Sequence, residues 1–197
     1  MTERRATIRD VARAAGVSTV TVSRVANAPE LVQAATRERV LRAMRELAYV
    51  PNLAARTMRT RATRSVGILV PDLVSPTNAA VAQAAERQLG LAGYSLLLVS
   101  SDYRAAREVA AIEVLRTRQV DGLLLYVSDE RDPGLAAALA GLGAPAVILD
   151  RTVAVDGDVL LSEHARPIHD VVAYLAAIGH RRLALLVPDL AIRPVLE

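Results

Sequence analysis

Residues 7–58 of the chain read TIRDVARAAGVSTVTVSRVANAPELVQAATRERVLRAMRELAYVPNLAARTM. Near the start of this stretch the apolar residues follow the spacing of one helical face, at Ile8, Val11, Ala12 and Ala15. Thr7 is a residue type that caps the N-terminus of a helix, and Gly16 is a type that ends one. The pattern predicts a short first helix that stops at Gly16.

Two more helices are predicted in the same stretch. Ser18 can cap the second helix, whose inward face is expected to hold Val22, Val25 and Ala26. The outward face of that helix then carries Val20, Ser23, Arg24 and Asn27. The third helix is expected from about Ala34, with a buried side made of Val40, Leu41, Met44, Leu47 and Ala48.

Two amphipathic helices joined at a glycine fit a helix-turn-helix unit. Such a unit lays one helix across the DNA backbone and presents the exposed face of the next to base edges in the major groove. By spacing alone, a plain helical hairpin in an all-α domain fits equally well.

The charge distribution divides the chain into two parts. Residues 1–64 hold 13 Arg and 5 acidic residues, for a net charge of +8, whereas residues 65–197 carry −5. A basic unit followed by an acidic one suggests a head that binds a polyanion and a body that does not, although a solvated basic face is the alternative.

The composition argues against several classes of protein. With no Cys, the chain can form neither a disulfide nor a thiolate nucleophile. The three histidines, His164, His169 and His180, lack the spacing of a metal site, and no catalytic triad or dyad is found. The N-terminus has no apolar signal stretch, and the longest charge-free run, 133–149, is broken by Gly and Pro. We therefore predict a cytoplasmic protein without a membrane segment, metal, cofactor or enzyme activity.

The details of the first part resemble the headpiece and hinge of the LacI/GalR (lactose-repressor) family of bacterial transcription regulators. The matching residues are Asp10-Val11-Ala12, Gly16-Val17-Ser18, Thr21-Val22-Ser23-Arg24-Val25, Asn27, Thr36-Arg37 and Tyr49-Val50-Pro51-Asn52. The resemblance implies a sequence-specific DNA-binding unit that reads one half of a pseudo-palindromic operator. One departure is Gln33, where the family usually has a Ser that caps the third helix.

The resemblance also implies roles for individual residues. Base reading falls to Thr19, Val20 and Arg24, of which Arg24 can pair bidentately with guanine. Contacts to the DNA backbone or orientation fall to Ser18, Thr21, Ser23, Asn27, Tyr49 and Asn52. For Ser18 and Thr21, helix capping is an alternative role that can hold at the same time.

The segment after Asn52 is too short and polar to form a stable helix alone. In the family it orders as a hinge helix on operator DNA and inserts a Leu into the minor groove. The matching residue here is Met58, which is also apolar but has more conformational entropy to lose. The alternative for Met58 is a linker residue without contacts.

From Ser65 onward, short apolar runs alternate with helical patterns. The runs are 66–70, 95–99, 122–126, 146–149 and 183–187, with room for a short strand near 159–161. The helices between them are marked by Val81, Val109, Leu135, Val171 and their periodic neighbours. Runs that are apolar on both faces, joined by crossover helices, predict a doubly wound parallel sheet of the α/β class.

In such folds, ligands bind beyond the carboxyl ends of the strands. The residues at these ends that we predict to contact a small-molecule effector are Asp72, Ser101, Tyr126, Asp150 and Arg151. Solvated loop positions are the alternative for most of them. The turn after the first strand has no glycine-rich phosphate loop, which argues against a nucleotide cofactor.

The second part resembles the periplasmic-binding-protein-like effector domain of the same family. The resemblance rests on residues 65–72, 92–94, 120–123, 149–151 and 179–182. It places the headpiece at 1–51, the hinge and linker at 52–64, the first lobe of the effector domain at 65–151 and the start of a second lobe at 152–197. Departures occur at Ser75-Pro76-Thr77-Asn78 and at Ser162-Glu163-His164, and the second lobe is expected to be truncated, which would weaken dimerisation and the response to a ligand.

The function that the sequence predicts is a DNA-binding transcription regulator, most simply a repressor, whose partners are double-stranded operator DNA, a small-molecule effector and a second copy of the chain. A soluble small-molecule-binding protein without regulatory output is the alternative from another class. An enzyme on an α/β scaffold is a third possibility, which the absence of a catalytic constellation disfavours.

Overall fold

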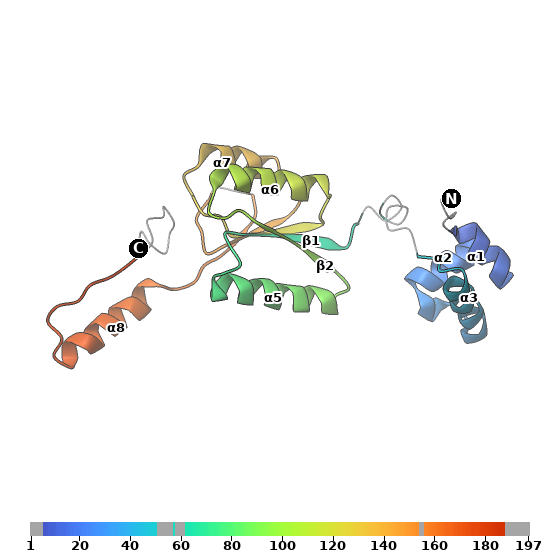
Figure 1. Ribbon diagram of the computed structural model, residues 1–197, viewed down its shortest axis with the longest axis horizontal. Coiled ribbons are helices and arrows are strands. Elements are labelled where there is room, and N and C mark those ends of the chain that lie inside the picture. Colours follow the sequence, from blue (N-terminus) through green and yellow to red (C-terminus); the bar gives the residue numbers. More distant parts are fainter. Residues whose placement is uncertain (1–5, 51–56, 58–61, 154–155, 188–197) are drawn as a thin grey trace. The chain divides into compact units, whose positions relative to one another are not determined.

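The computed structural model describes residues 6–50, 57, 62–153 and 156–187. The chain forms two compact units, Met1–Thr60 and Arg61–Glu197, which we call the headpiece and the body. The boundary between them falls inside the segment 52–64 that the sequence assigned to the hinge and linker. Figure 1 shows the helices and strands of both units.

The headpiece contains the three predicted helices, α1 (Ile8–Ala15), α2 (Thr19–Asn27) and α3 (Ala34–Glu46), and a short 3-10 turn, η1 (Pro29–Leu31). Helix α1 begins with a capping box, in which Thr7 and Asp10 each bind the other's backbone N–H. It ends at Gly16, whose φ of 63° is a left-handed conformation that glycine adopts without strain.

The core of the headpiece is aliphatic and small. It consists of Val11, Ala12 and Ala15 from α1, Val22 and Val25 from α2, and Val40, Ala43 and Met44 from α3. Four positions predicted to be buried are not: Ala26 and Ala48 are exposed, as are Leu41 and Leu47, at 38% and 36%. The reason is that the three described helices bury one narrow stripe of α3, so the flanking apolar residues face solvent.

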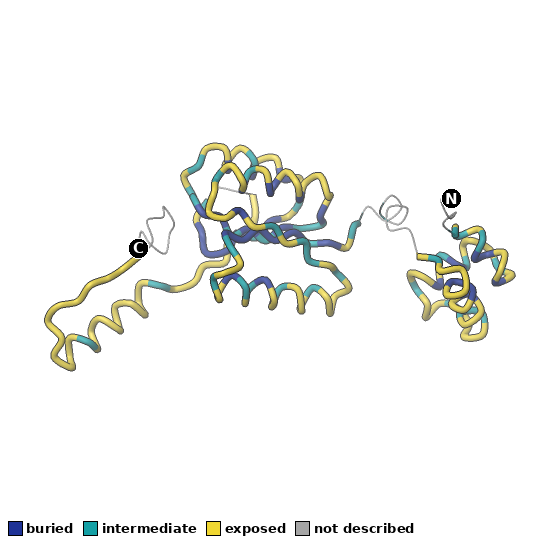
Figure 2. The backbone as a smooth tube through the Cα atoms, viewed as in Figure 1, coloured by how far each residue is buried: buried dark blue, intermediate teal, exposed yellow. Residues whose placement is uncertain are grey.

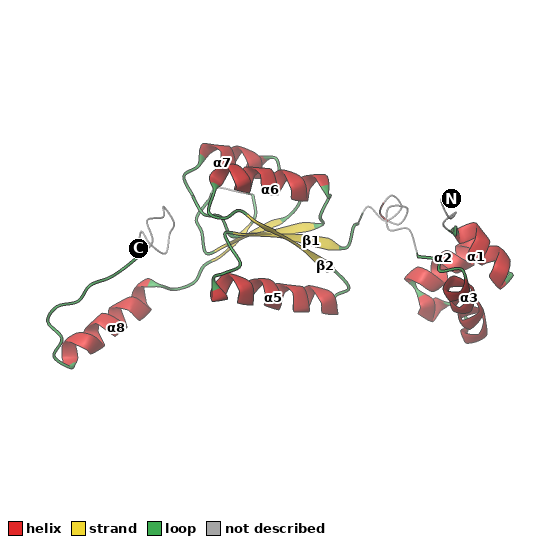
Figure 3. Ribbon diagram, in the orientation of Figure 1, coloured by secondary structure: helices red, strands yellow, loops and turns green. Residues whose placement is uncertain are grey.

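The body contains a five-stranded sheet in the order β2-β1-β3-β4-β5, in which every neighbouring pair is parallel. The strands are β1 (Ser65–Val70), β2 (Ser95–Ser100), β3 (Gly122–Leu125), β4 (Ala146–Leu149) and β5 (Asp158–Leu160). Helix α5 (Pro76–Leu91) covers one face, and α6 (Ala105–Thr117) and α7 (Pro133–Ala140) cover the other (Figure 3). The predicted doubly wound parallel sheet is confirmed.

The strands contain much of the buried chain of the body (Figure 2), and their alternating residues supply two cores. Ile68 and Val70 of β1 pack toward Ala82 of α5. Leu69, between them, belongs to the larger core with Ile112 and Leu115 of α6 and the apolar residues of α7. Because successive side chains of a strand point to opposite faces, one apolar run serves both layers. This layering brings the carboxyl ends of β1, β3 and β4 to the same edge of the sheet.

The last part of the body differs from the prediction. Helix α8 (Ala165–Ala177) forms as expected but has no buried residue. The predicted strand 183–187 is wrong: these residues have no regular structure, and Leu186 is 98% exposed. A strand needs a hydrogen-bonded neighbour, and no described strand lies beside this run to supply one. Hydrophobicity alone therefore overpredicted a strand here.

Candidate functional site

The start of α2 is organised by Ser18. The Ser18 hydroxyl accepts a hydrogen bond of 3.1 Å from the backbone N–H of Thr21, and the two hydroxyl oxygens lie 3.0 Å apart. Ser18 therefore caps α2, and Thr21 supplies the N–H group that is capped, which agrees with the alternative role that the sequence offered for these residues. A well-capped start fixes the orientation of the first turn of α2 and of the side chains on it.

The outward face of α2 carries the three residues predicted to read bases. Thr19, Val20 and Arg24 are exposed, and Val20 exposes 63% of its surface. A single exposed apolar side chain is common on the surface of a monomeric protein. Val20, however, lies one turn before Arg24 on the same face of α2, so the two side chains form one surface. The Arg24 carbonyl accepts a hydrogen bond from the Ala28 N–H at 2.8 Å, but its guanidinium group has no ion pair or hydrogen bond among the described residues and is available for a ligand.

The residues predicted to contact the DNA backbone are more varied. Asn27 is exposed and donates from Nδ2 to the Ser23 carbonyl at 2.6 Å, so part of its amide serves the end of α2. Tyr49 is half-buried against the headpiece core, and its backbone N–H donates to the Met44 carbonyl at 2.9 Å. Asn52 and Met58 lie outside the described residues.

At the carboxyl edge of the sheet, Asp72 follows β1 and closes a tight turn. It accepts hydrogen bonds from the Ser75 N–H at 2.6 Å and from Asn78 Nδ2 at 3.3 Å. The Ser75 bond holds the pKa of Asp72 below its ordinary value, against the opposing effect of partial burial. Asp72 is thus an ionised acceptor at the N-terminus of α5.

Asp150 and Arg151 follow β4 and form a network with Tyr126, which follows β3. Arg151 is buried, donates from Nε to the Val127 carbonyl at 2.8 Å and from Nη1 to the Asp150 carbonyl at 2.7 Å. Its guanidinium carbon lies 4.6 Å from the centre of the Tyr126 ring, and the Tyr126 hydroxyl donates to Asp150 Oδ2 at 3.3 Å. The structure therefore brings together three of the residues that the sequence predicted for the effector: Tyr126, Asp150 and Arg151. The hydrogen bonds of Arg151 hold the loops that carry Tyr126 and Asp150.

Asp150 also joins the sheet to α8. His164 Nε2 lies 2.9 Å from Oδ2 of Asp150, and the Ser162 N–H donates to Oδ1 at 3.0 Å. Burial raises the pKa of Asp150, but the hydrogen bonds from Ser162 and His164 outweigh it and the pKa lies below the ordinary value. In the sequence, His164 is considered as a metal ligand and as a departure from the family pattern, but its partner Asp150 is not evident, because a lone histidine before a helix carries no signal of a distant partner.

Glu108 is the main residue that the sequence missed. It lies in the first turn of α6, is fully buried, and accepts from the Ser128 N–H at 2.7 Å and from the Ser101 hydroxyl at 3.3 Å. Its second oxygen, Oε2, has no hydrogen-bond partner, and burial raises the pKa of the carboxyl group. Ser101, predicted as an effector contact, is fully buried and donates its hydroxyl to Glu108. It therefore stabilises the carboxyl edge of the sheet from inside the body. A charged residue on a predicted helix is normally assigned to the solvent-facing side, so no sequence pattern identified Glu108 as buried.

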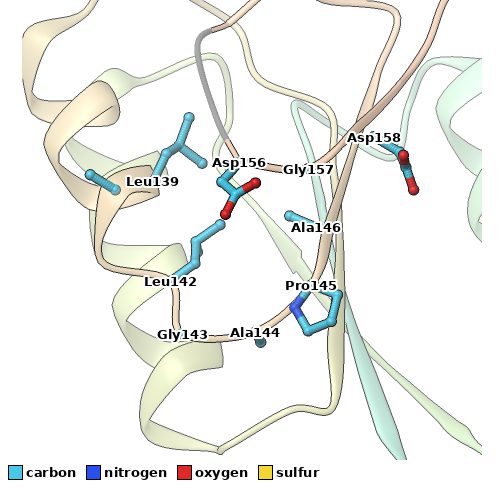
Figure 4. Close-up of a pocket in the computed structure, with 10 residues that line it drawn as sticks. Leu139, Leu142, Gly143, Ala144, Pro145, Ala146, Asp156, Gly157 and Asp158 are labelled. Carbon is cyan, nitrogen blue, oxygen red and sulfur yellow. The ribbon is translucent and has the colours of Figure 1, made fainter.

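A cavity of about 590 Å³ lies at the opposite, amino end of β4 and β5 (Figure 4). Leu142, Ala146, Asp156 and Asp158 are among its lining residues, and none of the predicted effector contacts is. The carboxyl edge, where polar side chains from several strands converge, is the better candidate site. Among the described residues there is no group of His, Asp or Glu that could hold a metal ion and no helix able to cross a membrane.

The headpiece and the parallel sheet together define a class of protein: a helix-turn-helix unit joined to a domain of the periplasmic-binding-protein type. Residues 7–52 match the model of the lacI family of bacterial regulatory proteins, and residues 63–190 match that of the periplasmic binding proteins and sugar binding domain of the LacI family. The chain belongs to the LacI family.

Individual relatives agree with this assignment. The HTH-type transcriptional regulator RegA of Clostridium acetobutylicum is 34% identical over 89% of this chain and 53% of the relative. The ribose operon repressor of Bacillus subtilis is 38% identical over 75% of this chain and 44% of the relative. The chain spans about half the length of the curated relatives it matches.

Solved structures show the same likeness. The lac repressor dimer bound to operator and an anti-inducer superimposes with a TM-score of 0.73 at 29% identity, covering 90% of this chain and 54% of that one. A complex of the transcriptional regulator CelR with cellobiose gives a TM-score of 0.55 at 30% identity, covering 94% of this chain and 56% of that one. The predicted family and fold class are therefore confirmed.

Proposed function

We propose that the protein is a sequence-specific DNA-binding transcription regulator, acting as a repressor, and that α2 is its recognition helix. The observation that carries this proposal is the outward face of α2, where exposed Thr19, Val20 and Arg24 follow a capped helix start. Arg24 has the geometry to pair bidentately with guanine O6 and N7, and Val20 can contact a thymine methyl group.

The remaining surface of the headpiece supports the same function. Residues 1–64 carry a net charge of +8, and Arg39, Arg42 and Arg45 of α3 are exposed. Positive charge of this density attracts the phosphate backbone and positions the head without reading sequence. Ser18, Thr21, Ser23, Asn27, Tyr49, Asn52 and Met58 are proposed as the remaining DNA contacts, and the cytoplasm as the place of action.

A small-molecule effector and a second copy of the chain are further proposed partners. Asp72, Tyr126, Asp150 and Arg151 lie at the carboxyl edge of the sheet, and Ser101 is buried there. The two aspartates are ionised, and each of the four residues takes part in hydrogen bonds. The solved relatives are a repressor dimer on its operator and a regulator bound to cellobiose, which supports an operator-binding dimer and a polar effector for this chain. In this scheme 1–51 is the headpiece, 52–64 the hinge and linker, 65–151 the first effector lobe and 152–197 the start of the second.

Selection of bound duplexes from a random pool tests the proposal. The expected result is enrichment of pseudo-palindromic sequences that share one half-site and a fixed spacing, since two equivalent heads read two equivalent half-sites. A matched selection with the Arg24→Ala variant should lose the preference at one base pair in each half-site. Recovery of unenriched sequences by the unaltered chain would overturn the assignment of α2 as a recognition helix.

A further inference from the structure

The chain enters the body at a point held by Asp121, which directly precedes β3. The backbone N–H of Thr63 donates to Asp121 Oδ1 at 2.7 Å, and the N–H of Arg64 donates to Oδ2 at 2.9 Å. These residues are separated by 57 and 58 positions in the sequence. One carboxylate thus binds the two residues immediately before the first strand of the sheet.

Neighbouring groups complete this attachment. The Thr63 hydroxyl lies 2.8 Å from Asp121 Oδ1 and 2.7 Å from Ser65 Oγ. The Arg64 carbonyl accepts from the Ser95 N–H at 2.9 Å, and the Asp121 N–H donates to the Ser65 carbonyl at 2.8 Å. The first residue of β2 and the residue before β3 therefore hold the chain by hydrogen bonds at the start of β1.

The Asp121 carboxylate accepts hydrogen bonds from backbone N–H groups that lie outside the paired strands. Strand β1 begins at Ser65, so the N–H groups of Thr63 and Arg64 lie ahead of the paired region and take a side-chain acceptor instead. Arg64 has a φ of 52°, a left-handed conformation that a residue other than glycine keeps only when its surroundings hold it. Partial burial raises the pKa of Asp121, but the hydrogen bonds from Thr63 and Arg64 outweigh it, so the group is ionised at neutral pH and its bonds are charge-assisted.

We propose that Asp121 is a positioning residue for two-headed DNA binding, because it fixes the end of the segment that tethers the headpiece to the body. This inference rests on the proposed function. When one head is bound, the second binds as a tethered group, and its effective concentration depends on the length and stiffness of the tether. Asp121 removes Thr63 and Arg64 from the tether and fixes the direction in which the chain leaves the body.

Added length alone has a small effect. Releasing two residues extends the reach by about 7 Å, and effective concentration falls only as roughly the −3/2 power of length. The larger effect is entropic, since the released backbone of each chain must be ordered again when both heads engage. We therefore expect about a tenfold loss of affinity for a complete operator and less than a twofold change for a single half-site.

The experiment uses the full chain and duplexes obtained by the selection described above. Asp121→Ala removes both acceptors, whereas Asp121→Asn keeps one acceptor and places an N–H₂ group against a backbone N–H. Thr63→Val removes only the hydroxyl contacts and should have a smaller effect. Glu113→Gln is the matched control, because the partners of this exposed carboxylate among the described residues are its helix neighbours Arg116 and Thr117.

Three measurements are made on each variant: affinity for a single half-site, affinity for the complete operator, and tolerance of operators with one or two base pairs added between the half-sites. Both Asp121 variants should weaken binding to the complete operator and flatten the spacing preference while half-site affinity is kept. Amide exchange at Thr63 and Arg64 should be slow in the unaltered chain and fast in the Asp121 variants. Sequence-specific half-site binding reports on the proposed function separately.

Several outcomes would overturn the role of Asp121. Equal losses on half-site and operator would mean that the substitution damages the headpiece or the fold in general. Unchanged operator affinity and spacing preference in both variants would show that the attachment is irrelevant to DNA binding. If the unaltered chain binds the complete operator no more tightly than a single half-site, the two heads do not bind cooperatively, and Asp121 cannot have the proposed role.

Discussion

At the residue scale, the two candidate sites depend on opposite kinds of side chain. On α2, Val20 and Arg24 are exposed and their side chains have no ion pair or hydrogen bond among the described residues, which is what a surface needs in order to form new contacts. At the sheet edge, Arg151 and Glu108 are buried, and their partners are inside the body. We propose that the first kind of residue contacts DNA, whereas the second kind holds neighbouring groups of the body in place.

Arg24→Ala should weaken binding to the preferred DNA site by about 1–3 kcal/mol and remove discrimination at one base pair, because a bidentate contact to guanine is lost. Asn27→Ala should weaken binding to all sequences more evenly. Competition binding with single-base variants of the selected site separates the two effects. Equal loss on specific and random DNA for Arg24→Ala would assign this residue to the phosphate contacts instead.

Glu108 should make the stability of the body depend on pH. Because burial raises its pKa in the folded state, the unfolded chain ionises first as the pH rises above the ordinary value of about 4.5. The unaltered chain should therefore lose free energy of unfolding relative to Glu108→Gln between that pH and neutrality. Gln keeps an acceptor for the Ser128 N–H but carries no charge.

Urea denaturation of both proteins across this pH range checks the prediction. Glu113→Gln serves as the control, because the hydrogen bond from Arg116 lowers the pKa of Glu113. The pH dependence of Glu113 therefore falls below its ordinary pKa, and above that value the difference between this variant and the unaltered chain should stay constant. A constant difference between the unaltered chain and Glu108→Gln would mean that Glu108 is not the source of the pH dependence.

At the scale of elements, the three helices of the headpiece start differently. Thr7 and Ser18 cap α1 and α2 through their side chains, whereas Gln33 precedes α3 without a side-chain hydrogen bond. The departure at Gln33 noted in the sequence therefore leaves the longest helix of the headpiece with the weakest start. Its backbone, with φ of −53° and ψ of 139°, is extended as an N-cap residue requires.

Gln33→Ser should stabilise the headpiece by about 0.5–1 kcal/mol, since a hydroxyl at this position can accept a hydrogen bond from an unpaired N–H of the first turn. Gln33→Ala is the matched control and should not stabilise it. Thermal unfolding followed by circular dichroism should show the shift in the transition of the headpiece. If the Ser variant is no more stable than the Ala variant, the start of α3 is capped in another way.

At the scale of the whole molecule, the two structural units differ in the sign of their net charge. The headpiece, which carries the candidate DNA interface, has a net charge of +6, whereas the body, which carries the candidate effector edge, has a net charge of −3. Like charges on DNA and body disfavour contact between them, so the body should contribute little to DNA affinity directly.

Binding to duplex DNA should weaken steeply as salt is added, with a contribution of about −0.9 to the log-log slope for each phosphate that the headpiece neutralises. Titrations at several salt concentrations measure the slope. Arg42→Gln, on the exposed surface of α3, tests whether that helix contributes, and Arg87→Gln, on α5 of the body, should leave the slope unchanged. A slope near zero for the unaltered chain would contradict the proposed DNA binding.

The sequence by itself determined the elements that follow a local rule. The caps at Thr7 and Ser18, the glycine turn at Gly16, and the strands 66–70, 95–99 and 146–149 were predicted within a residue or so, because periodicity and capping depend on near neighbours in the chain. The outward face of α2 followed from the same periodicity. The family resemblance then supplied the roles of its residues, which no local rule contains.

Only the tertiary structure decided where a residue depends on a distant partner. Leu41 and Leu47 are exposed because the described part of the headpiece does not cover them, and 183–187 is not a strand because no described strand lies beside it. Glu108, His164 and Asp121 gain their significance from Ser128, Asp150 and Thr63, which are remote in sequence. Burial and hydrogen bonding between distant segments are properties of packing, and a single sequence specifies them only through the fold.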